Sequence, residues 1–196
     1  MAKTLLQMAG ADLTPPKLGD AALVVIDAQR EYVDGALPLP GVEPALDNIA
    51  KLLAAARKAG SPIVHVQHRG RPAGLFDPEK PAFELAPQAA ARDDEEIVGK
   101  ALPNAFAGTR LKDVLDAAGG KRIVLAGFMT HMCISSTARA ALDLGYQTAV
   151  AADACATRDL PRTDGGTISA ADLHEAELAA LADRFAIVAT TAEFIG

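Results

Sequence analysis

The sequence contains no tryptophan, only two cysteines, and only 4% aromatic residues. Two cysteines, at positions 133 and 155, cannot build a disulfide framework, so we expect a reducing, cytoplasmic compartment. No apolar run approaches the roughly 18 residues that a membrane-spanning helix needs. Residues 1–8 are too mildly apolar for a signal peptide. We therefore expect a soluble protein that has no membrane partner.

Basic residues are also scarce relative to acidic ones. The chain has 19 lysines and arginines against 25 aspartates and glutamates, which gives a formal net charge of −6. Surfaces that bind nucleic acid are normally basic, so this balance argues against such a partner. Half of the residues are hydrophobic, which is enough for a substantial core in a chain of 196 residues. We expect a single domain that spans residues 1–196.

Short apolar runs alternate with amphipathic segments along the chain. Strands that alternate with helices in this way form a parallel sheet covered by helices on both faces. We therefore predict an α/β fold, a three-layer sandwich with a central, mostly parallel sheet. The apolar runs predict strands at 21–26, 62–67, 95–100, 123–127, 147–152 and 185–189, and 3.6-residue periodicity predicts helices at 43–59, 109–118, 134–144 and 169–184.

Two segments lack this alternation. Residues 1–20 contain breakers such as Thr14-Pro15-Pro16 and are expected to lie on the surface as a leader. Residues 68–94 are rich in proline and glycine, with Phe76 and Phe83 as apolar anchors. Irregular loops of this length inside a compact domain usually have a function, so we expect a lid or an interface arm.

Cys133 stands just after a buried strand, where the next helix is expected to begin. Free N–H groups at a helix N-terminus lower the pKa of a thiol and can hold an oxyanion. A small buried hydrophobic side chain is the competing interpretation of any lone cysteine. Because strand-to-helix turns often carry catalytic groups, Cys133 is a candidate nucleophile.

Asp27 and Lys100 strengthen that candidate. Asp27 ends the first predicted strand, and acids at the carboxyl end of a buried strand often belong to a site. If this strand lies beside the one that precedes Cys133, the Asp27 carboxylate can exchange protons with the thiol. Lys100 lies in an apolar setting, where a cation beside both groups would keep them ionised. The alternatives are an aspartate that caps a turn and a surface lysine.

Three motifs in this order resemble the isochorismatase-like cysteine hydrolases, which include nicotinamidases, carbamoylsarcosine amidases, ureidoacrylate amidohydrolases and streptothricin hydrolases. The resemblance covers the chain from Leu23 to about Val188. The motifs are Val24-Val25-Ile26-Asp27-Ala28-Gln29, then Gly99-Lys100 before Asn104-Ala105-Phe106, then Gly127-Phe128-Met129-Thr130-His131-Met132-Cys133. In the residues they contain, these motifs are most similar to those of the broadly annotated cysteine hydrolases near the streptothricin hydrolases.

The resemblance implies a hydrolase with the catalytic triad Asp27, Lys100 and Cys133. It also implies a cis peptide between Phe128 and Met129, and an oxyanion hole formed by the backbone N–H groups of Met129 and Cys133. The expected reaction cleaves a C–N bond of a small amide, lactam or carbamoyl compound through a thioester. Because relatives commonly assemble and the alanine-rich helices are exposed, we expect a homodimer or homotetramer.

The sequence departs from two branches of this family. Nicotinamidases carry an Asp-x-His metal motif, but Val66-Gln67-His68-Arg69-Gly70 stands at that place, so we expect neither a metal nor another cofactor. Isochorismatases proper often lack the cysteine and cleave a vinyl ether. That reaction remains the alternative within the family, although Cys133 favours C–N cleavage.

Further side chains near the three motifs are candidates for contact with the substrate. The set consists of Gln29, Tyr32, His68, Phe106, Phe128 and His131. For each of them, ordinary packing is the competing interpretation. We expect His65 to be a core histidine, His174 a solvated surface residue, Cys155 a structural thiol, and Arg158-Asp159 an exposed ion pair.

Three other classes of protein remain open. A redox protein would use Cys133 and Cys155 as a dithiol pair. A flavodoxin-like module would bind phosphate after the first strand, but Asp27-Ala28-Gln29-Arg30 stands there and an acid repels phosphate. A metal-dependent hydrolase would need His65, His68 and Asp153 to converge.

Overall fold

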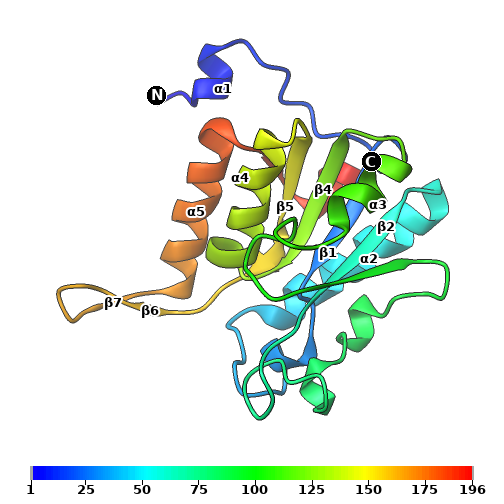
Figure 1. The fold of residues 1–196 in the computed structure, drawn as a ribbon. Coiled ribbons are helices and arrows are strands. Elements are labelled where there is room, and N and C mark those ends of the chain that lie inside the picture. Colours follow the sequence, from blue (N-terminus) through cyan, green and yellow to red (C-terminus); the bar gives the residue numbers. More distant parts are fainter. Residues whose placement is uncertain (1, 196) are drawn as a thin grey trace.

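A six-stranded parallel sheet forms the centre of the protein (Figure 1). The structure, a computed structural model, describes residues 2–195. The strand order is β3-β2-β1-β4-β5-β8, and every neighbouring pair runs parallel. The predicted α/β fold is therefore confirmed. The strands are β1 (Ala22–Ile26), β2 (Ile63–His68), β3 (Glu96–Lys100), β4 (Arg122–Phe128), β5 (Gln147–Ala156) and β8 (Ile187–Ala189).

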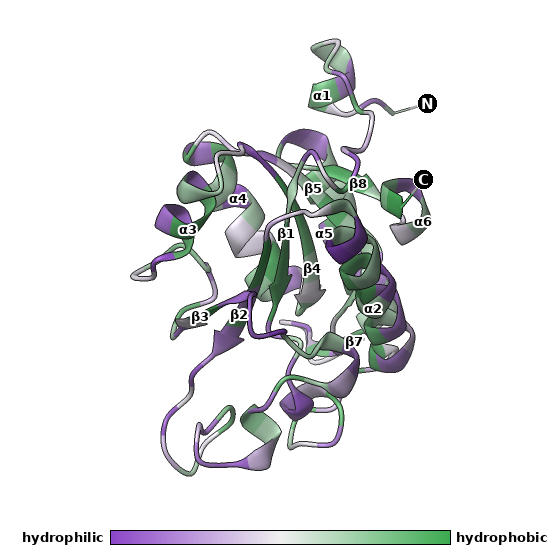
Figure 2. Ribbon diagram, turned by 90° about the vertical axis from the view of Figure 1, so that its right-hand side faces the viewer, coloured by the Kyte–Doolittle hydropathy of each residue, from purple (hydrophilic) through white to green (hydrophobic). Residues whose placement is uncertain are grey.

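Helices cover both faces of the sheet, as the pattern of the sequence predicts. The helices α2 (Val42–Ala59) and α6 (Thr191–Ile195) pack on one face. The helices α3 (Leu111–Ala117), α4 (Ser135–Asp143) and α5 (Ala170–Arg184) pack on the other. In Figure 2 the strands are green along most of their length and β2 turns purple at its end. The sheet is thus apolar inside and polar at its carboxyl edge, where sites form in such folds.

The order in which the chain adds strands changes direction at the centre of the sheet. From β1 the chain adds β2 and β3 toward one edge, and it then adds β4, β5 and β8 toward the other. Strands β1 and β4 pair in parallel, with Ile26 opposite Gly127. Ligands in open α/β sheets bind at such a reversal, beyond the carboxyl ends of the strands. Asp27 follows β1, Lys100 ends β3, and Cys133 follows β4, so all three residues lie at this edge.

Position 127 requires glycine because the backbone of β1 lies very close to it. A Cβ atom at this position would lie 2.0 Å from the backbone oxygen of Ile26, and the φ angle of Gly127 is +117°. Side chains neither fit this space nor readily adopt this φ angle. The β4–β5 ladder shifts its register between Leu125 and Gly127, and it resumes with Gly127 opposite Cys155.

Four features differ from the pattern predicted from the sequence. Strand β5 does not end at Asp153 but continues to Ala156. The loop expected after it contains a two-stranded hairpin of β6 (Leu160–Pro161) and β7 (Thr167–Ile168), which projects from the body in Figure 1. The predicted leader includes a short helix, α1 (Leu5–Met8). Helix α6 was not predicted. Over residues 2–195, every helix is too short or too polar to cross a bilayer.

The long loop after β2 is bound to the segment that follows Asp27. Short 3₁₀ turns lie at Arg30–Tyr32, Pro81–Phe83 and Pro87–Ala89. The backbone N–H of Ala86 donates to Ala28 O, and that of Arg30 donates to Glu84 O, each at 2.8 Å. The loop therefore packs along the carboxyl edge of the sheet, beside the candidate site.

Candidate active site

Asp27 is fixed at the end of β1 by its backbone. Its N–H donates to Val66 O of the adjacent strand at 2.8 Å, and its φ angle is 52°, in the left-handed region. Non-glycine residues adopt this region rarely, and mostly at sites where the surrounding structure imposes it. The side chain is fully buried. The fold thus holds one carboxylate, in one orientation, beneath the edge of the sheet.

Lys100 connects Asp27 to the thiol of Cys133. Its Nζ lies 2.7 Å from Asp27 Oδ2 and 3.3 Å from Cys133 Sγ. A third contact, of 3.1 Å, joins Nζ to His68 Nδ1. An ammonium group has three hydrogens to donate, and each of these neighbours can accept one. Lys100 is only 2% exposed, so it is not the surface lysine of the alternative interpretation.

Cys133 lies within a turn of π-helix rather than at the first residue of the α-helix. The π-turn spans Thr130–Ile134, and α4 begins after it at Ser135. Such turns occur frequently at functional sites. Cys133 is 5% exposed. Burial, together with the nearby Asp27 carboxylate, raises the pKa of the thiol to about 12. The expectation of a lowered thiol pKa is therefore wrong, because desolvation outweighs the charge of Lys100.

The same burial acts on Asp27. Desolvation raises the pKa of its carboxyl group, while the Lys100 ammonium opposes that shift. One buried cation offsets one anion, so the centre favours a state with one proton shared by Asp27 and Cys133. In that state a carboxylate lies beside a protonated thiol, an arrangement in which the carboxylate can accept the thiol proton.

The turn between β4 and Cys133 is held by hydrogen bonds within it and from neighbouring elements. The peptide bond between Phe128 and Met129 is cis, where the resemblance places it. The carbonyl of Met129 accepts the N–H groups of Met132 and Ile134. Side chains on other elements support this turn. Thr130 Oγ1 lies 2.9 Å from Nδ1 of His174 on α5, and His131 Nδ1 is hydrogen-bonded to Thr157 Oγ1 after β5.

Aromatic rings enclose the site on the side of β1. Tyr32 is 2% exposed and meets Phe128 edge to face at a centroid distance of 5.7 Å. Phe76, from the long loop, meets both Tyr32 and His68 edge to face at 5.1 Å. The predicted role of Phe76 as an apolar anchor is confirmed, since it is 6% exposed. Four of the predicted pocket residues, Tyr32, His68, Phe128 and His131, thus lie around the triad.

Gln29 has a different role from the predicted contact with the substrate. The side chain is fully buried. Its Oε1 accepts the backbone N–H of His68 at 2.8 Å, and its Nε2 donates to the backbone oxygens of Phe83 and His68. Since these bonds occupy both donors and the oxygen, Gln29 fastens the long loop to the end of β2.

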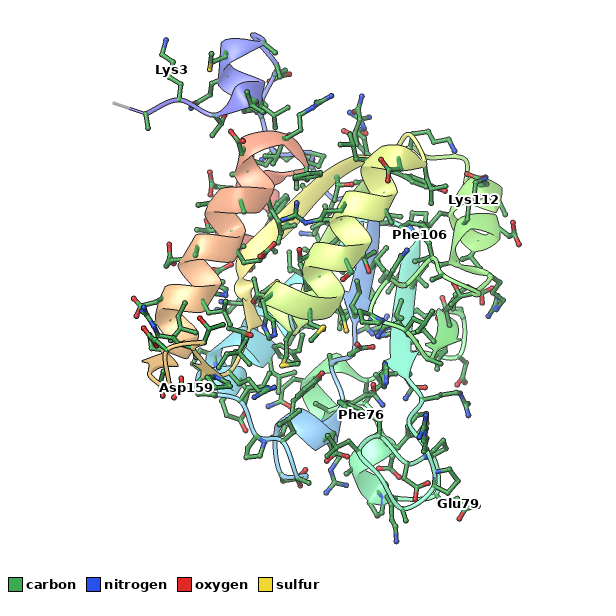
Figure 3. All side chains as sticks on the ribbon, turned by 60° about the vertical axis from the view of Figure 1, so that its left-hand side comes forward. Lys3, Phe76, Glu79, Phe106, Lys112 and Asp159 are labelled. Carbon is green, nitrogen blue, oxygen red and sulfur yellow. The ribbon has the colours of Figure 1, made fainter. Side chains whose placement is uncertain are left out.

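Phe106 lies away from the site and does not form the predicted pocket wall. Its ring stacks on Tyr146 at a centroid distance of 5.6 Å. Tyr146 Oη in turn donates to Asp116 of α3. Figure 3 shows Phe106 close to Lys112 of α3, whereas Phe76 lies lower in that view, away from α3. The loop after β3 thus turns back along the face of the sheet.

The three residues of the metal-site hypothesis lie apart and have other partners. His65 is fully buried, as predicted for a core histidine, and its Nε2 lies 2.9 Å from Glu95 Oε2. His68 contacts Lys100, and Asp153 Oδ1 accepts both the backbone N–H and the hydroxyl of Thr191. Within residues 2–195, no group of three or more His, Cys, Asp or Glu residues could hold a metal ion.

The two cysteines have different environments. Both are free thiols and both are buried. Cys155 interacts with the backbone of Gly127, and burial raises the pKa of its thiol to about 12. Cys133 alone contacts Lys100.

Two predictions about charged side chains near the site are wrong. His174 is half-buried and contacts Thr130, rather than lying in solvent, because α5 packs against the π-turn. Arg158 does not pair with the carboxylate of Asp159; it donates only to the backbone oxygen of that residue, at 3.3 Å. Its Nε is buried without a hydrogen bond. The long β5 carries Arg158 toward the site, and the apolar pattern alone did not show where that strand ends.

A separate hollow lies at the opposite edge of the sheet. It has a volume of about 450 Å³ and is lined in part by Leu6, Leu13, Tyr146 and Phe185. None of the three triad residues lines it, and its walls come from the leader, the amino ends of strands and the carboxyl ends of α4 and α5. It therefore lies apart from the site where the fold gathers its reactive groups.

The chain matches the model of a known protein family over nearly its whole length. The isochorismatase domain aligns with residues 21–193. Among solved structures, an isochorismatase from Pseudomonas putida has 44% sequence identity and a TM-score of 0.95, and the match covers 99% of this chain and 100% of that one.

Curated relatives show the same similarity. A secreted isochorismatase effector of Verticillium dahliae is 39% identical over 91% of this chain and 92% of its own length. A streptothricin hydrolase of Streptomyces noursei is 38% identical over 85% of this chain and 61% of its own length. A maleamate amidohydrolase of Pseudomonas putida is 30% identical over 86% of this chain and 82% of its own length.

Proposed function

Because this chain belongs to the isochorismatase family of hydrolases, we propose that it cleaves a C–N bond of a small molecule with Cys133 as the nucleophile. The observation that carries the proposal is the position of Lys100 Nζ, 2.7 Å from Asp27 Oδ2 and 3.3 Å from Cys133 Sγ. These contacts bring a thiol, a carboxylate and an ammonium group together at one buried site, which supports the roles of nucleophile, base and cation proposed for them. Amidohydrolases among the relatives support the same reaction class.

In the first half of the reaction, Asp27 accepts the thiol proton while Cys133 Sγ attacks the carbonyl carbon. The carbonyl oxygen takes the electron pair of the C=O bond and becomes an oxyanion. Backbone N–H groups of Met129 and Cys133 hold that oxyanion, an effect worth about 3–4 kcal/mol for each donor in other hydrolases. Asp27 then returns the proton to the leaving nitrogen. The C–N bond breaks, and a thioester remains on Cys133.

In the second half, Asp27 accepts a proton from water as the water oxygen attacks the thioester carbon. The second oxyanion collapses, the C–S bond breaks, and the carboxylic or carbamic acid product leaves. The proton on Asp27 returns to the sulfur, which restores the resting thiol. Lys100 keeps its charge throughout and offsets the single negative charge that moves between Asp27, Cys133 and the oxyanion.

Substitution of each cysteine in turn tests this proposal. Cys133→Ala should lower kcat by about 100-fold or more, since nucleophilic attack is lost. Cys155→Ala is the matched control, because Cys155 is 6% exposed, close to the 5% of Cys133. It should keep near-wild-type activity. A panel of small amides, lactams and carbamoyl compounds supplies the substrates, and mass spectrometry of quenched enzyme should detect the acyl adduct on Cys133.

A fully active Cys133→Ala enzyme would exclude the thioester mechanism. If the enzyme cleaved vinyl ethers but no amide, the alternative reaction of the family would hold instead. A reversible disulfide between Cys133 and Cys155, found by mass in a non-reduced sample, would favour the redox hypothesis.

We also propose that the protein is a cytoplasmic homodimer or homotetramer. Leu5 and Met8 of α1 support self-association, since they are 51% and 70% exposed and exposed apolar side chains favour interfaces. One relative is named as a secreted effector, so the location needs its own test. Sedimentation of the purified protein measures the assembly, and fractionation of the source cells measures the location.

A further inference from the structure

The hollow between the leader and the amino edge of the sheet has the size of a small-molecule site. Its volume is about 450 Å³, and sites that hold small ligands usually measure about 300–1,000 Å³. Its walls are the leader, the amino ends of β4, β5 and β8, and the carboxyl ends of α4 and α5. Figure 1 shows α1 at the end of α5 that lies away from the β6–β7 hairpin. The proposed hydrolysis makes no use of this space.

Apolar side chains make up more than half of the lining. They include Leu6, Leu13, Leu142, Phe185 and Ile187. Leu6 is partly buried, whereas Leu5 and Met8 of the same helix are 51% and 70% exposed. The leader thus turns Leu6 and Leu13 toward the body of the protein. Between these walls the hollow offers an apolar surface to a ligand.

One polar side chain of the lining is buried without a partner. Thr148, near the start of β5, is 6% exposed, and its Oγ1 forms no hydrogen bond within residues 2–195. Buried hydroxyl groups are almost always hydrogen-bonded, because an unpaired one costs free energy. A polar group of a ligand in the hollow would supply the missing partner.

Two arginines make the lining positive. Arg122 begins β4 and Arg184 ends α5, and neither forms an ion pair within residues 2–195. Arg122 Nε donates to the backbone oxygen of Asp20 at 3.1 Å. Asp12 also lines the hollow, but its Oδ1 accepts the N–H of Thr14 at 2.9 Å. Two arginines and one aspartate give the lining a formal charge of +1.

The ends of α4 and α5 oppose this charge only in part. The carboxyl end of a helix carries partial negative charge, which solvent screens where the end is exposed. Each guanidinium has a full charge and a planar set of N–H donors that suits a carboxylate. In the β4–β5 ladder, Arg122 lies opposite Gln147, the residue before Thr148. The arginine and the unpaired hydroxyl therefore come from adjacent positions at the start of two paired strands.

We propose that the hollow binds a small carboxylate that has an apolar body. The carboxylate lies toward Arg122 and Arg184 and accepts a hydrogen bond from Thr148 Oγ1, and the apolar body lies against the leader. Such a ligand contacts the leader and the body of the protein together, so it fastens α1, whose Leu5 N–H donates to Asp183 Oδ1 at 2.8 Å. The site is separate from the triad, and this inference does not depend on the proposed hydrolysis.

Two probes that differ in charge test the site. Phenylbutyrate joins a ring and a short chain to a carboxylate, whereas phenylbutanol has a hydroxyl in place of the carboxylate. Neither contains an amide, so the proposed reaction cannot consume them. Calorimetry should give a Kd of about 1 mM or tighter for phenylbutyrate and binding about tenfold weaker for phenylbutanol. Equal binding of the two probes would overturn the proposal.

Replacement of both arginines, Arg122→Gln together with Arg184→Gln, tests their part in the site. This variant should bind phenylbutyrate about tenfold more weakly and phenylbutanol as the wild type does. Arg162→Gln is the matched control, since Arg162 lies in the distant hairpin and pairs with Asp164 at 3.0 Å. It should change neither Kd. If the double variant kept the wild-type affinity for phenylbutyrate, the charge of the hollow would not select the ligand, and the proposal would fail.

Thr148→Val separates contact with the ligand from a structural role. Valine removes the unpaired hydroxyl, so Tm without ligand should stay the same or rise. The affinity for phenylbutyrate should nevertheless fall about two- to tenfold, because the hydrogen bond to the ligand is lost. A lower Tm without ligand would show that the hydroxyl is already paired in the free protein, which contradicts the proposal. Unchanged affinity would contradict it as well.

Hydrogen exchange locates the bound probe without any measurement of activity. With saturating phenylbutyrate, the amides of residues 5–14 should exchange more slowly, because the ligand holds the leader against α5. The amides of residues 160–168, in the hairpin, are the internal reference and should exchange at an unchanged rate. Protection that appeared at residues 130–134 instead of the leader would place the probe at the triad and overturn the proposal.

Discussion

The Lys100 ammonium group, the Asp27 carboxyl group and the Cys133 thiol share the buried centre of the site. The balance of charge among them sets the pKa of the thiol. Lys100 contacts Asp27 and Cys133 at once. The Asp27 charge raises the pKa of the Cys133 thiol, and the Lys100 charge lowers it. With both neighbours present, burial keeps the pKa of the thiol at about 12. In the proposed mechanism, therefore, the thiol loses its proton to Asp27 during attack, and no thiolate is held at rest.

This balance predicts opposite effects on alkylation and on catalysis. Asp27→Asn removes a negative charge and leaves Lys100, so the pKa of Cys133 should fall. Iodoacetamide should then label Cys133 at neutral pH about tenfold faster than in the wild type, since each pKa unit changes the thiolate fraction tenfold. Hydrolysis should nevertheless drop by about 100-fold or more, because the proton acceptor is lost. Peptide mapping measures the labelling.

Two comparisons make this prediction specific. Lys100→Met should slow the labelling of Cys133, since it removes the charge that lowers the thiol pKa. Cys155, which does not contact Lys100, should label at the same rate in every variant. Slower labelling of Cys133 in Asp27→Asn would show that the carboxylate assists ionisation of the resting thiol.

Residue type and local context suffice to predict the three central residues, but they do not fix their neighbours. Asp27 and Cys133 follow apolar strands, and Lys100 stands out in an apolar setting. Gln29 has an equally suggestive place, yet its amide binds the backbone of Phe83, 54 positions away. Arg158 was predicted to form an exposed ion pair with Asp159, but it donates only to the backbone oxygen of that residue, because β5 extends to Ala156, beyond its apolar run.

At the level of elements, the approach of β1 to β4 sets the distance between Asp27 and the turn that carries Cys133. Position 127 has no room for a side chain, because a Cβ atom would lie 2.0 Å from the backbone oxygen of Ile26. The backbone cannot yield as a flexible side chain would. Any residue other than glycine must push the two strands apart at the edge where the triad assembles.

We therefore predict that Gly127→Ala costs about 3 kcal/mol or more in free energy of unfolding. The control is Gly145→Ala, which has a φ angle of +80° and no atom within 4 Å of the added Cβ. That variant should lose only about 1–2 kcal/mol in free energy of unfolding, because alanine must adopt a left-handed backbone there. Urea unfolding measures both. Equal losses would show that φ alone, and not the contact with β1, requires glycine at position 127.

The elements themselves were predictable except where tertiary contacts extend or end them. Asp27 and Asp153 both follow an apolar run, and each was taken to end its strand. Asp27 does so, whereas β5 continues past Asp153 to Ala156. The difference arises from the β4–β5 register shift and from Thr191, whose backbone and hydroxyl bind the Asp153 carboxylate. Neither cause is visible in the local sequence.

For the molecule as a whole, one buried cluster joins the edge of the sheet to α2. Glu95, just before β3, accepts from Arg57 Nε of α2 at 2.7 Å and from the Arg92 N–H at 2.9 Å. Its Oε2 also lies 2.9 Å from His65 Nε2 of β2. Since β3 ends in Lys100, the cluster holds the edge strand that delivers the cation to the site.

This cluster predicts how stability depends on pH. Hydrogen bonds from Arg57 first, and then from the Arg92 backbone and His65, lower the pKa of Glu95 from 4.5 to about 2. Because the folded pKa is lowered, the contribution is fully present above about pH 4.5 and is lost as the pH falls toward 2. Glu95→Gln should therefore cost about 2–3 kcal/mol at neutral pH and less than about half of that near pH 3. Thermal unfolding at the two pH values measures this.

Glu96→Gln is the control, because Glu96 pairs with Arg110 but is 50% exposed. It should cost less than about 1 kcal/mol at either pH. A loss in Glu95→Gln that is the same at both pH values would show that packing, rather than the charge of Glu95, holds the edge strand.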